Sequence, residues 1–127
     1  MKRSLTVFIL FLGMSFLFSS CGSTDAAEKT ANKFFSLLLK GDTINANKFV
    51  ETGFDSQQQL KEVARLGKND SDGKLISAKK MMGFNTQMVN GVTSVTLPYE
   101  LKYEQNELSV QVTLVDEGSG FKIRSIN

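Results

Sequence analysis

Few side chains in this sequence are suited to covalent or acid–base chemistry. The chain has 127 residues, no histidine and one cysteine, Cys21. A histidine-dependent triad and a normal zinc site are therefore excluded. The remaining candidate acids and bases are Tyr99, Tyr103, Lys80 and Glu51, which is a poor set for most reactions. We therefore predict no catalytic activity, no bound metal and no cofactor.

The single cysteine follows a segment with the features of a signal peptide. Lys2 and Arg3 are positively charged, and residues 5–18 are uncharged and mostly apolar. Such a stretch suits the hydrophobic region of a signal peptide and is shorter than the roughly 20 residues that span a bilayer core. Residues 19–21 (SSC) then place two serines before the cysteine. The segment resembles the signal peptide of bacterial lipoproteins, whose lipobox ends in an acylated cysteine.

This resemblance implies a lipid anchor on Cys21. Residues 1–20 would be the signal peptide, 21–24 a lipidated tether and 25–127 a single domain. Two or three acyl chains would hold the protein firmly at the membrane, because each buried methylene contributes about 0.8 kcal/mol. The implied location is the cell envelope, on the outer membrane, since residues 22–23 offer no inner-membrane retention aspartate. An ordinary signal peptide with a free cysteine and an uncleaved membrane anchor are the alternatives.

The charge balance argues against a nucleic-acid partner. Removal of Lys2 and Arg3 lowers the basic residues from 15 to 13, and all 13 acidic residues lie beyond Cys21. The mature chain would therefore be neutral, with both signs interspersed. A nucleic-acid-binding domain instead carries a basic patch or stripe.

Three amphipathic helices are predicted in the first half of the chain. Alanine, phenylalanine and leucine recur at helical spacing over residues 25–40. Further helices are predicted over 43–50 and 55–66. Asp42 and Asp55 stand at the starts of these two segments, where an aspartate side chain can accept hydrogen bonds from free backbone N–H groups. We interpret the apolar stripes as core packing.

Residues 68–74 (KNDSDGK) form a polar segment that invites comparison with a calcium loop. An EF-hand with Gly73 at its sixth position would place Lys68 first and Lys79 twelfth, where carboxylates are required. The comparison fails, and Asp70 and Asp72 are interpreted as turn residues.

The second half of the chain has the spacing of strands. Four strands of an antiparallel meander are predicted over residues 75–89, 92–104, 107–115 and 120–126. Asn90-Gly91 predicts a type I′ turn between the first two, because both central residues of that turn need positive φ. A tight turn at Gln105-Asn106 and a loop over 116–119 are expected to join the others.

These turns predict one register and one buried face. The pairs include Met82 with Tyr99, Tyr103 with Leu108 and Leu114 with Phe121. Because side chains alternate across a strand, a slip of one residue would reverse the apolar face. Gly83 and Pro98 fall opposite each other, which predicts a bend that curls the sheet.

This arrangement of helices and sheet resembles a known superfamily. Together with Ala31, residues 34–35 (FF) and residues 38–42 (LLKGD), it is similar to the cystatin-like cone of the nuclear-transport-factor-2-like superfamily. The similarity extends to small bacterial lipoproteins of unknown function in that superfamily. The implied fold class is α+β. Members include isomerase-like enzymes and ligand-binding domains, so the fold leaves the function open.

Two functions follow as hypotheses. The favoured one is a non-catalytic domain that binds an envelope protein or a small apolar ligand inside the cone. The candidate lining residues are Phe35, Met82, Phe84, Tyr99 and Tyr103. The alternative is a small isomerase- or hydrolase-like enzyme with a tyrosine as proton donor. The inner sheet face carries no carboxylate, so only Glu51 on a predicted helix is placed to supply a base.

Overall fold

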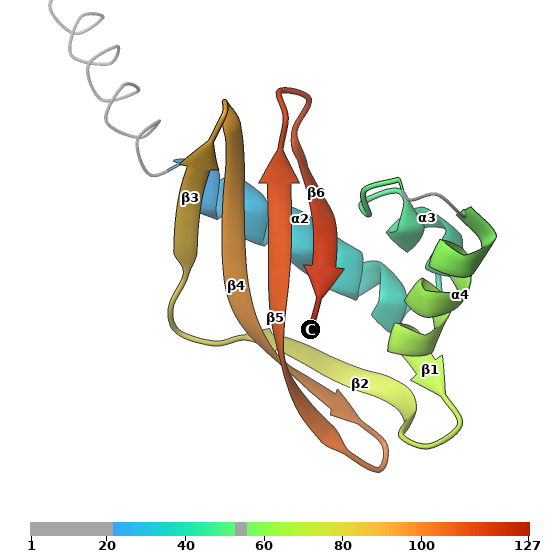
Figure 1. Ribbon diagram of the computed structural model, residues 1–127. Coiled ribbons are helices and arrows are strands. Elements are labelled where there is room, and N and C mark those ends of the chain that lie inside the picture. Colours follow the sequence, from blue (N-terminus) through green and yellow to red (C-terminus); the bar gives the residue numbers. More distant parts are fainter. Residues whose placement is uncertain (1–21, 53–55) are drawn as a thin grey trace, which may run out of the picture.

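A computed structural model of the protein describes residues 22–52 and 56–127 (Figure 1). Within these ranges, three helices precede a curled antiparallel sheet, which confirms the predicted α+β class. The helices are α2 (Gly22–Leu39), α3 (Thr43–Asn47) and α4 (Ser56–Gly67). No helix here is long and apolar enough to cross a membrane. The predicted signal peptide, Cys21 and Asp55 lie outside the described residues.

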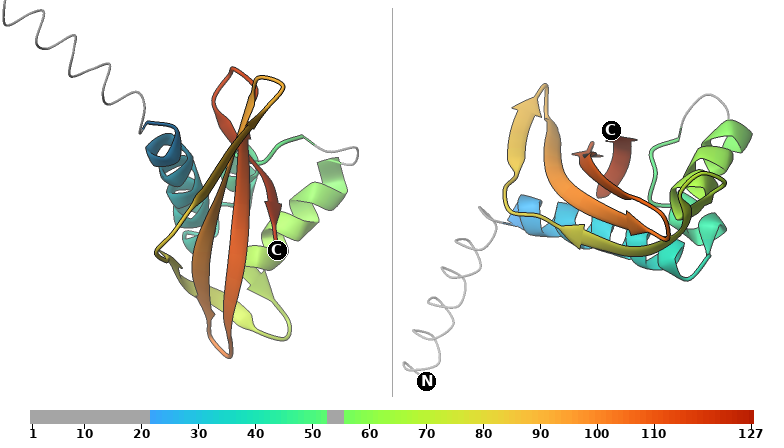
Figure 2. Two further views of the ribbon diagram at one scale, coloured as in Figure 1. Left: turned by 60° about the vertical axis from the view of Figure 1, so that its left-hand side comes forward. Right: turned by 90° about the horizontal axis from the view of Figure 1, so that it is seen from below.

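The sheet contains more strands than predicted. In the described chain they are β1 (Lys68–Asn69), β2 (Gly73–Lys80), β3 (Asn85–Val89), β4 (Val92–Tyr103), β5 (Glu107–Asp116) and β6 (Phe121–Ile126). The order is β1-β2-β4-β5-β6, and β3 also pairs with β4. β3 pairs with the first half of β4 and β2 with its second half, so β2 and β3 follow the same side of β4 (Figure 2).

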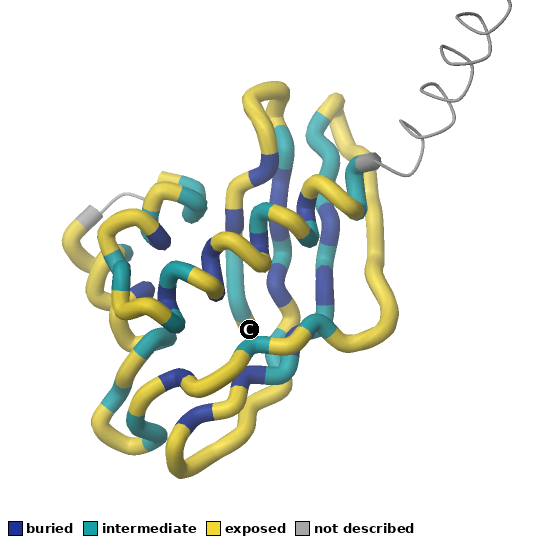
Figure 3. The backbone as a smooth tube through the Cα atoms, turned by 180° about the vertical axis from the view of Figure 1, so that it is seen from behind, coloured by how far each residue is buried: buried dark blue, intermediate teal, exposed yellow. Residues whose placement is uncertain are grey.

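The hydrophobic core lies between α2 and one face of the sheet. Ala27, Ala31, Phe34, Phe35 and Leu38 are buried at intervals of one helical turn, which gives α2 one apolar face. Figure 3 shows α2 crossing the back of the sheet, with its buried positions repeating along the helix. Burial of each of the larger side chains contributes about 1.5–3 kcal/mol.

Two helix boundaries differ from the prediction. α2 begins at Gly22, inside the predicted tether, and Asp25 lies in its first turn, where a carboxylate interacts favourably with the helix dipole. α3 starts after Asp42 as predicted, since the Asp42 side chain accepts a hydrogen bond from the Asn45 N–H at 3.2 Å. α3 ends at Asn47 rather than at residue 50.

The early end of α3 has a cause in the sheet. The Glu51 N–H donates to the Ile123 carbonyl at 2.8 Å, and the Ile123 N–H donates to the Phe49 carbonyl at 2.8 Å. Val50 thereby forms a parallel bridge with Ile123. The segment 49–51 is therefore extended along the edge of β6 instead of continuing the helix.

The predicted strand 75–89 is wrong in its middle, where residues 81–84 leave the ladder. Lys80 pairs with Tyr99, the partner predicted for Met82. The Met81 N–H donates to the Pro98 carbonyl at 2.9 Å, but Pro98 has no N–H to continue the ladder on this side. Gly83 adopts a φ of 111°, and the chain bends here, as predicted for Gly83 and Pro98.

Asn90 and Gly91 have φ values of 53° and 78° and join the paired residues Val89 and Val92, which confirms the I′ turn. The other two registers are wrong by two residues. Leu108 pairs with Leu101 rather than with Tyr103. Likewise, Leu114 pairs with Ile123 instead of Phe121.

The turn after β4 lies one residue earlier than predicted, at Glu104 and Gln105. The Tyr103 N–H donates to the Asn106 carbonyl at 2.7 Å, and a neighbouring turn holds the two residues between them. Glu104 N–H donates to the Lys74 carbonyl at 3.1 Å, and Gln105 N–H donates to the Asp72 carbonyl at 3.0 Å. The Asp72 N–H in turn donates to Asn69 Oδ1 at 2.6 Å. Asp72 thus has the turn role predicted for it, and it also braces the adjacent hairpin.

A shift of two residues leaves each side chain on the same face, so most of the predicted buried face of β4, β5 and β6 is confirmed, although Leu108 near the start of β5 is 38% exposed. Its buried members are Val95, Leu97, Tyr99, Leu101, Tyr103, Val112, Leu114, Phe121 and Ile123. The prediction is wrong for β3 and the bend before it. Met82, Phe84 and Met88 are exposed there, because α2 does not extend over β3.

Candidate functional site

The space under the curled sheet is filled by aromatic side chains. The rings of Phe35 and Tyr99 are 4.9 Å apart, and those of Phe34 and Phe35 are 5.2 Å apart. All three side chains are buried. The centre of the fold is therefore a packed core at the place where the sequence suggested a ligand-lined cone.

Both tyrosine hydroxyls have structural partners. Tyr99 donates to Asn32 Oδ1 on α2 at 2.6 Å, and Tyr103 donates to the Leu66 carbonyl at the end of α4 at 2.7 Å. Burial raises the pKa of Tyr99, and the negative charge of Glu28 adds to the rise. The pKa of Tyr103 is also raised by burial. Each hydroxyl thus stays protonated and ties the sheet to a helix.

The five candidate lining residues do not lie together. Phe35 and Tyr99 are in contact in the core, and Tyr103 lies by the end of α4. Met82 is 97% exposed and Phe84 63% exposed, both in the bend between β2 and β3. The sequence placed these two on the inner face because it could not show the break in the strand.

The candidate acid Glu51 is also engaged. Arg124 donates from Nε to Glu51 Oε2 at 2.8 Å and from Nη2 to Glu51 Oε1 at 3.0 Å. The hydrogen bonds from Arg124 and its positive charge hold the pKa of Glu51 below its ordinary value. Lys80 donates to the neighbouring Met81 carbonyl at 3.1 Å. Glu51 is therefore not brought together with the tyrosines, and Lys80 pairs with Tyr99 across the strands but donates from its ammonium to the Met81 carbonyl.

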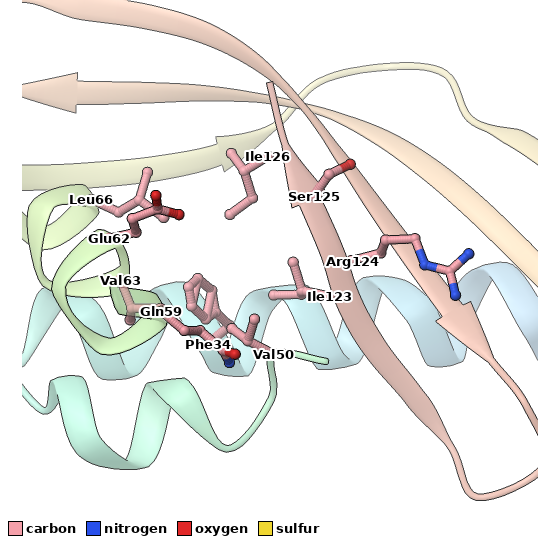
Figure 4. A pocket seen from close by; sticks show the side chains of 10 residues that line it. All are labelled: Phe34, Val50, Gln59, Glu62, Val63, Leu66, Ile123, Arg124, Ser125 and Ile126. Carbon is pink, nitrogen blue, oxygen red and sulfur yellow. The ribbon is translucent and has the colours of Figure 1, made fainter. Parts of the chain in front are cut away.

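A groove of about 270 Å³ lies between α4 and β6 (Figure 4). We call it the α4–β6 groove. It is lined by Phe34, Val50, Gln59, Glu62, Val63, Leu66, Ile123, Arg124, Ser125 and Ile126. The groove exists because α4 packs mainly against α3, α2 and β1, which leaves β6 uncovered on this side.

The groove combines an apolar floor with a polar rim. Phe34, Val63 and Ile123 are floor residues from three different elements, and all are buried. Glu62 and Arg124 bring charge of opposite sign to its lining. This is the composition of a site that binds an apolar group and orients it by a few polar contacts.

Sequence reasoning assigned the groove residues to the core. The helical spacing of Val63 and Leu66 and the alternation around Ile123 do predict apolar faces. The uncovered gap between those faces depends on how far α4 is displaced from β6, which spacing does not encode. Searches against protein-family models and curated proteins found no match for the chain.

Proposed function

We propose that this protein is a membrane-anchored lipoprotein of the cell envelope whose domain binds a ligand and has no catalytic activity. The membrane anchor is the lipid on Cys21 that the sequence of residues 2–21 implies. The order of three helices before a curled sheet supports a cystatin-like fold of the nuclear-transport-factor-2-like superfamily. The α4–β6 groove is the observation that supports binding.

The size of the groove limits its ligand. Its volume of about 270 Å³ lies just below the range of about 300–1,000 Å³ that holds drug-sized molecules. We infer that it accepts a small apolar ligand or one apolar side chain of an envelope protein. Its rim leaves room for a polar contact to that group from Glu62.

The geometry gives the enzymatic alternative little support. A tyrosine acid would need a free hydroxyl beside a base. Tyr99 and Tyr103 donate to protein acceptors, and burial raises the pKa of each. The carboxylate of Glu51 is held by Arg124 at the sheet edge.

The groove is tested by filling it. Ile126 lines the groove, is half-buried and points toward Leu66 across it (Figure 4), so Ile126→Phe places a ring in it. We expect this variant to bind an apolar fluorescent probe such as anilinonaphthalene sulfonate at least about tenfold more weakly, which corresponds to about 1.4 kcal/mol. Ser109→Phe is the control, because Ser109 is an exposed β5 residue outside the groove lining. Equal affinities of both variants and the unmodified protein would remove the groove as the binding site.

A further inference from the structure

The hairpin of β3 and the start of β4 carries uncovered apolar side chains. Besides Met82 and Phe84, Met88 is 73% exposed and Val89 62% exposed. All five residues of β3 are exposed, and Figure 3 shows this strand exposed along its whole length. We refer to residues 81–92 as the apolar hairpin. An exposed apolar surface of this kind marks a place where another surface docks.

The apolar hairpin also lacks the usual protection of a sheet edge. Among the described strands, β3 pairs with β4 alone, so its other edge is open. Edge strands in soluble proteins are commonly guarded by charged side chains, above all by lysine. Residues 81–99 contain no charged residue, and the nearest charges along the chain are Lys79 and Lys80 at the end of β2 and Glu100 in β4. The hairpin is thus uncharged, and of these three residues Lys79 and Glu100 pair with each other.

The position of the hairpin indicates what covers it. Ser23 and Ala26 in the first turns of α2 line the same surface hollow as Thr93, and Thr93 pairs with Met88. Figure 1 shows the hairpin in front of the start of α2, and Figure 2 shows its turn curving away from that helix. Cys21 directly precedes the first residue of this helix, and consecutive Cα atoms are about 3.8 Å apart. A lipid on Cys21 would therefore enter the membrane close to the hairpin.

We propose that the apolar hairpin rests on the lipid bilayer, with Met82, Phe84 and Met88 at the boundary between headgroups and acyl chains. This inference depends on the lipid anchor of the proposed function. Lys80 would face anionic headgroups, whereas Lys79 points to the opposite face of β2 and lies across from Glu100. Partial insertion of apolar side chains beside basic residues is how proteins lie on a membrane surface without spanning it.

A bilayer suits the hairpin better than a second copy of the chain. The anchor would hold each hairpin at the membrane surface. Contact between the hairpin and the bilayer would therefore not depend on protein concentration. Edge-to-edge pairing of two copies would depend on their surface density. The contact also leaves the α4–β6 groove accessible, because α4 lies beyond the far end of α2 (Figure 1). α2 has 18 residues, or a length of about 27 Å.

A tryptophan reporter tests the contact. The chain contains no tryptophan, so Phe84→Trp gives a single signal. The acylated full-length variant is reconstituted in vesicles of phosphatidylethanolamine and phosphatidylglycerol, with and without brominated acyl chains. We expect its emission to shift to shorter wavelength and to be quenched by the brominated lipid. Ile44→Trp is the control, because Ile44 on α3 is 71% exposed and lies beyond the other end of α2, and its emission should not change.

The outcomes separate this inference from the proposed function. The acyl mass on the N-terminal peptide is measured first, and its absence would overturn the anchor and the contact together. An acylated Phe84→Trp variant with unchanged tryptophan emission would overturn the contact alone. The tryptophan emission could also shift without quenching by the brominated lipid, and the shift could grow with the surface density of the protein. That result would overturn the bilayer contact and indicate pairing with a second copy of the chain. Met82→Asp in the Phe84→Trp background should abolish the shift without disturbing the fold, since Met82 is 97% exposed.

Discussion

At the scale of single residues, Tyr99 and Tyr103 illustrate how one residue type serves different roles. Both were predicted as lining of a pocket, and both are buried on the predicted face. Their hydroxyl groups reach Asn32 on α2 and the Leu66 carbonyl of α4. The second of these bonds satisfies a carbonyl that a helix end leaves without an intrahelical partner. The sequence identifies the face of a tyrosine, but its hydroxyl partner depends on the packing.

Tyr99→Phe should lower stability in a pH-dependent way. The lost hydrogen bond to Asn32 should cost about 0.5–1.5 kcal/mol at neutral pH. Because the pKa of Tyr99 is raised by burial, the folded chain keeps a proton that the unfolded chain releases above about pH 10. This group therefore lowers the free energy of unfolding as pH rises beyond that value. Urea unfolding should show a shallower alkaline decline for the variant, and parallel curves would contradict the assignment.

Alanine substitutions at two glycines should change the stability of the fold in opposite directions. Gly91 has a φ of 78° and no atom within 4 Å of an added Cβ, so Gly91→Ala adds backbone strain alone. We expect a loss of about 1–2 kcal/mol. Gly67 ends α4 without positive φ, and its added Cβ would make an ordinary 3.6 Å contact with Leu38. Gly67→Ala should gain about 0.4–1 kcal/mol. An unchanged or raised unfolding midpoint for Gly91→Ala would contradict the turn geometry, and a lowered midpoint for Gly67→Ala would contradict the helix-end prediction.

At the scale of elements, the periodicity of the sequence predicts faces better than registers. The helical stripe of α2 and the alternation along β4, β5 and β6 identified most of the buried residues correctly, but Leu108 is exposed and Val115 is buried, contrary to the prediction. The pairings of β4 with β5 and of β5 with β6 were wrong by two residues, and a shift of that size moves no side chain to the other face. The position of the turn decides between such registers. Between β4 and β5 it depends on the contacts of Glu104 and Gln105 with the turn around Asp72.

The break between β2 and β3 was only partly predictable. Gly83 and Pro98 correctly marked the bend. The alternation of Met82, Phe84 and Met88 predicted a continued buried strand, yet all three are exposed. Burial requires a covering element, and α2 reaches only the other strands of the sheet. The α4–β6 groove was missed for the same reason, since it is a gap between two correctly predicted faces.

The extended segment after α3 should depend on its ion pair with β6. Glu51→Gln removes a two-pronged contact with Arg124 whose side chains are 35% and 47% exposed. The cost should be small, about 0.2–1 kcal/mol near neutral pH. The pKa of Glu51 is lowered, so its contribution is present above the unfolded pKa, about 4.3, and is lost as pH falls below it. The Ile123 and Glu51 amides should exchange hydrogen faster in the variant.

Glu117→Gln is the control for this prediction. Glu117 contacts the same guanidinium at 3.5 Å by one oxygen and is 62% exposed, so its loss should leave the amide exchange nearly unchanged. Equal effects of the two substitutions would show that the segment 49–51 is held by its backbone bonds to Ile123 alone.

At the scale of the whole molecule, α2 separates two surfaces with different proposed roles. The apolar hairpin lies at its start, beside the place where Cys21 precedes the helix. The α4–β6 groove lies toward its other end, where Phe34 contributes to the floor. A chain anchored at its N-terminus would thus present the groove away from the bilayer. The fold therefore accommodates both a membrane contact and a binding site without competition between them.

The last prediction concerns the lipid anchor on Cys21. We expect the N-terminal peptide of the mature protein to begin at Cys21 and to carry acyl mass. Cys21→Ser should remove that mass. It should also weaken membrane association, because the apolar hairpin alone offers a few exposed side chains against the many methylenes of two or three acyl chains. Ser23→Ala, two residues after the cysteine, is a control that keeps the thiol and the residues before it. Unchanged membrane association of Cys21→Ser, together with an unmodified N-terminal peptide in the original chain, would show that another segment holds the protein at the membrane.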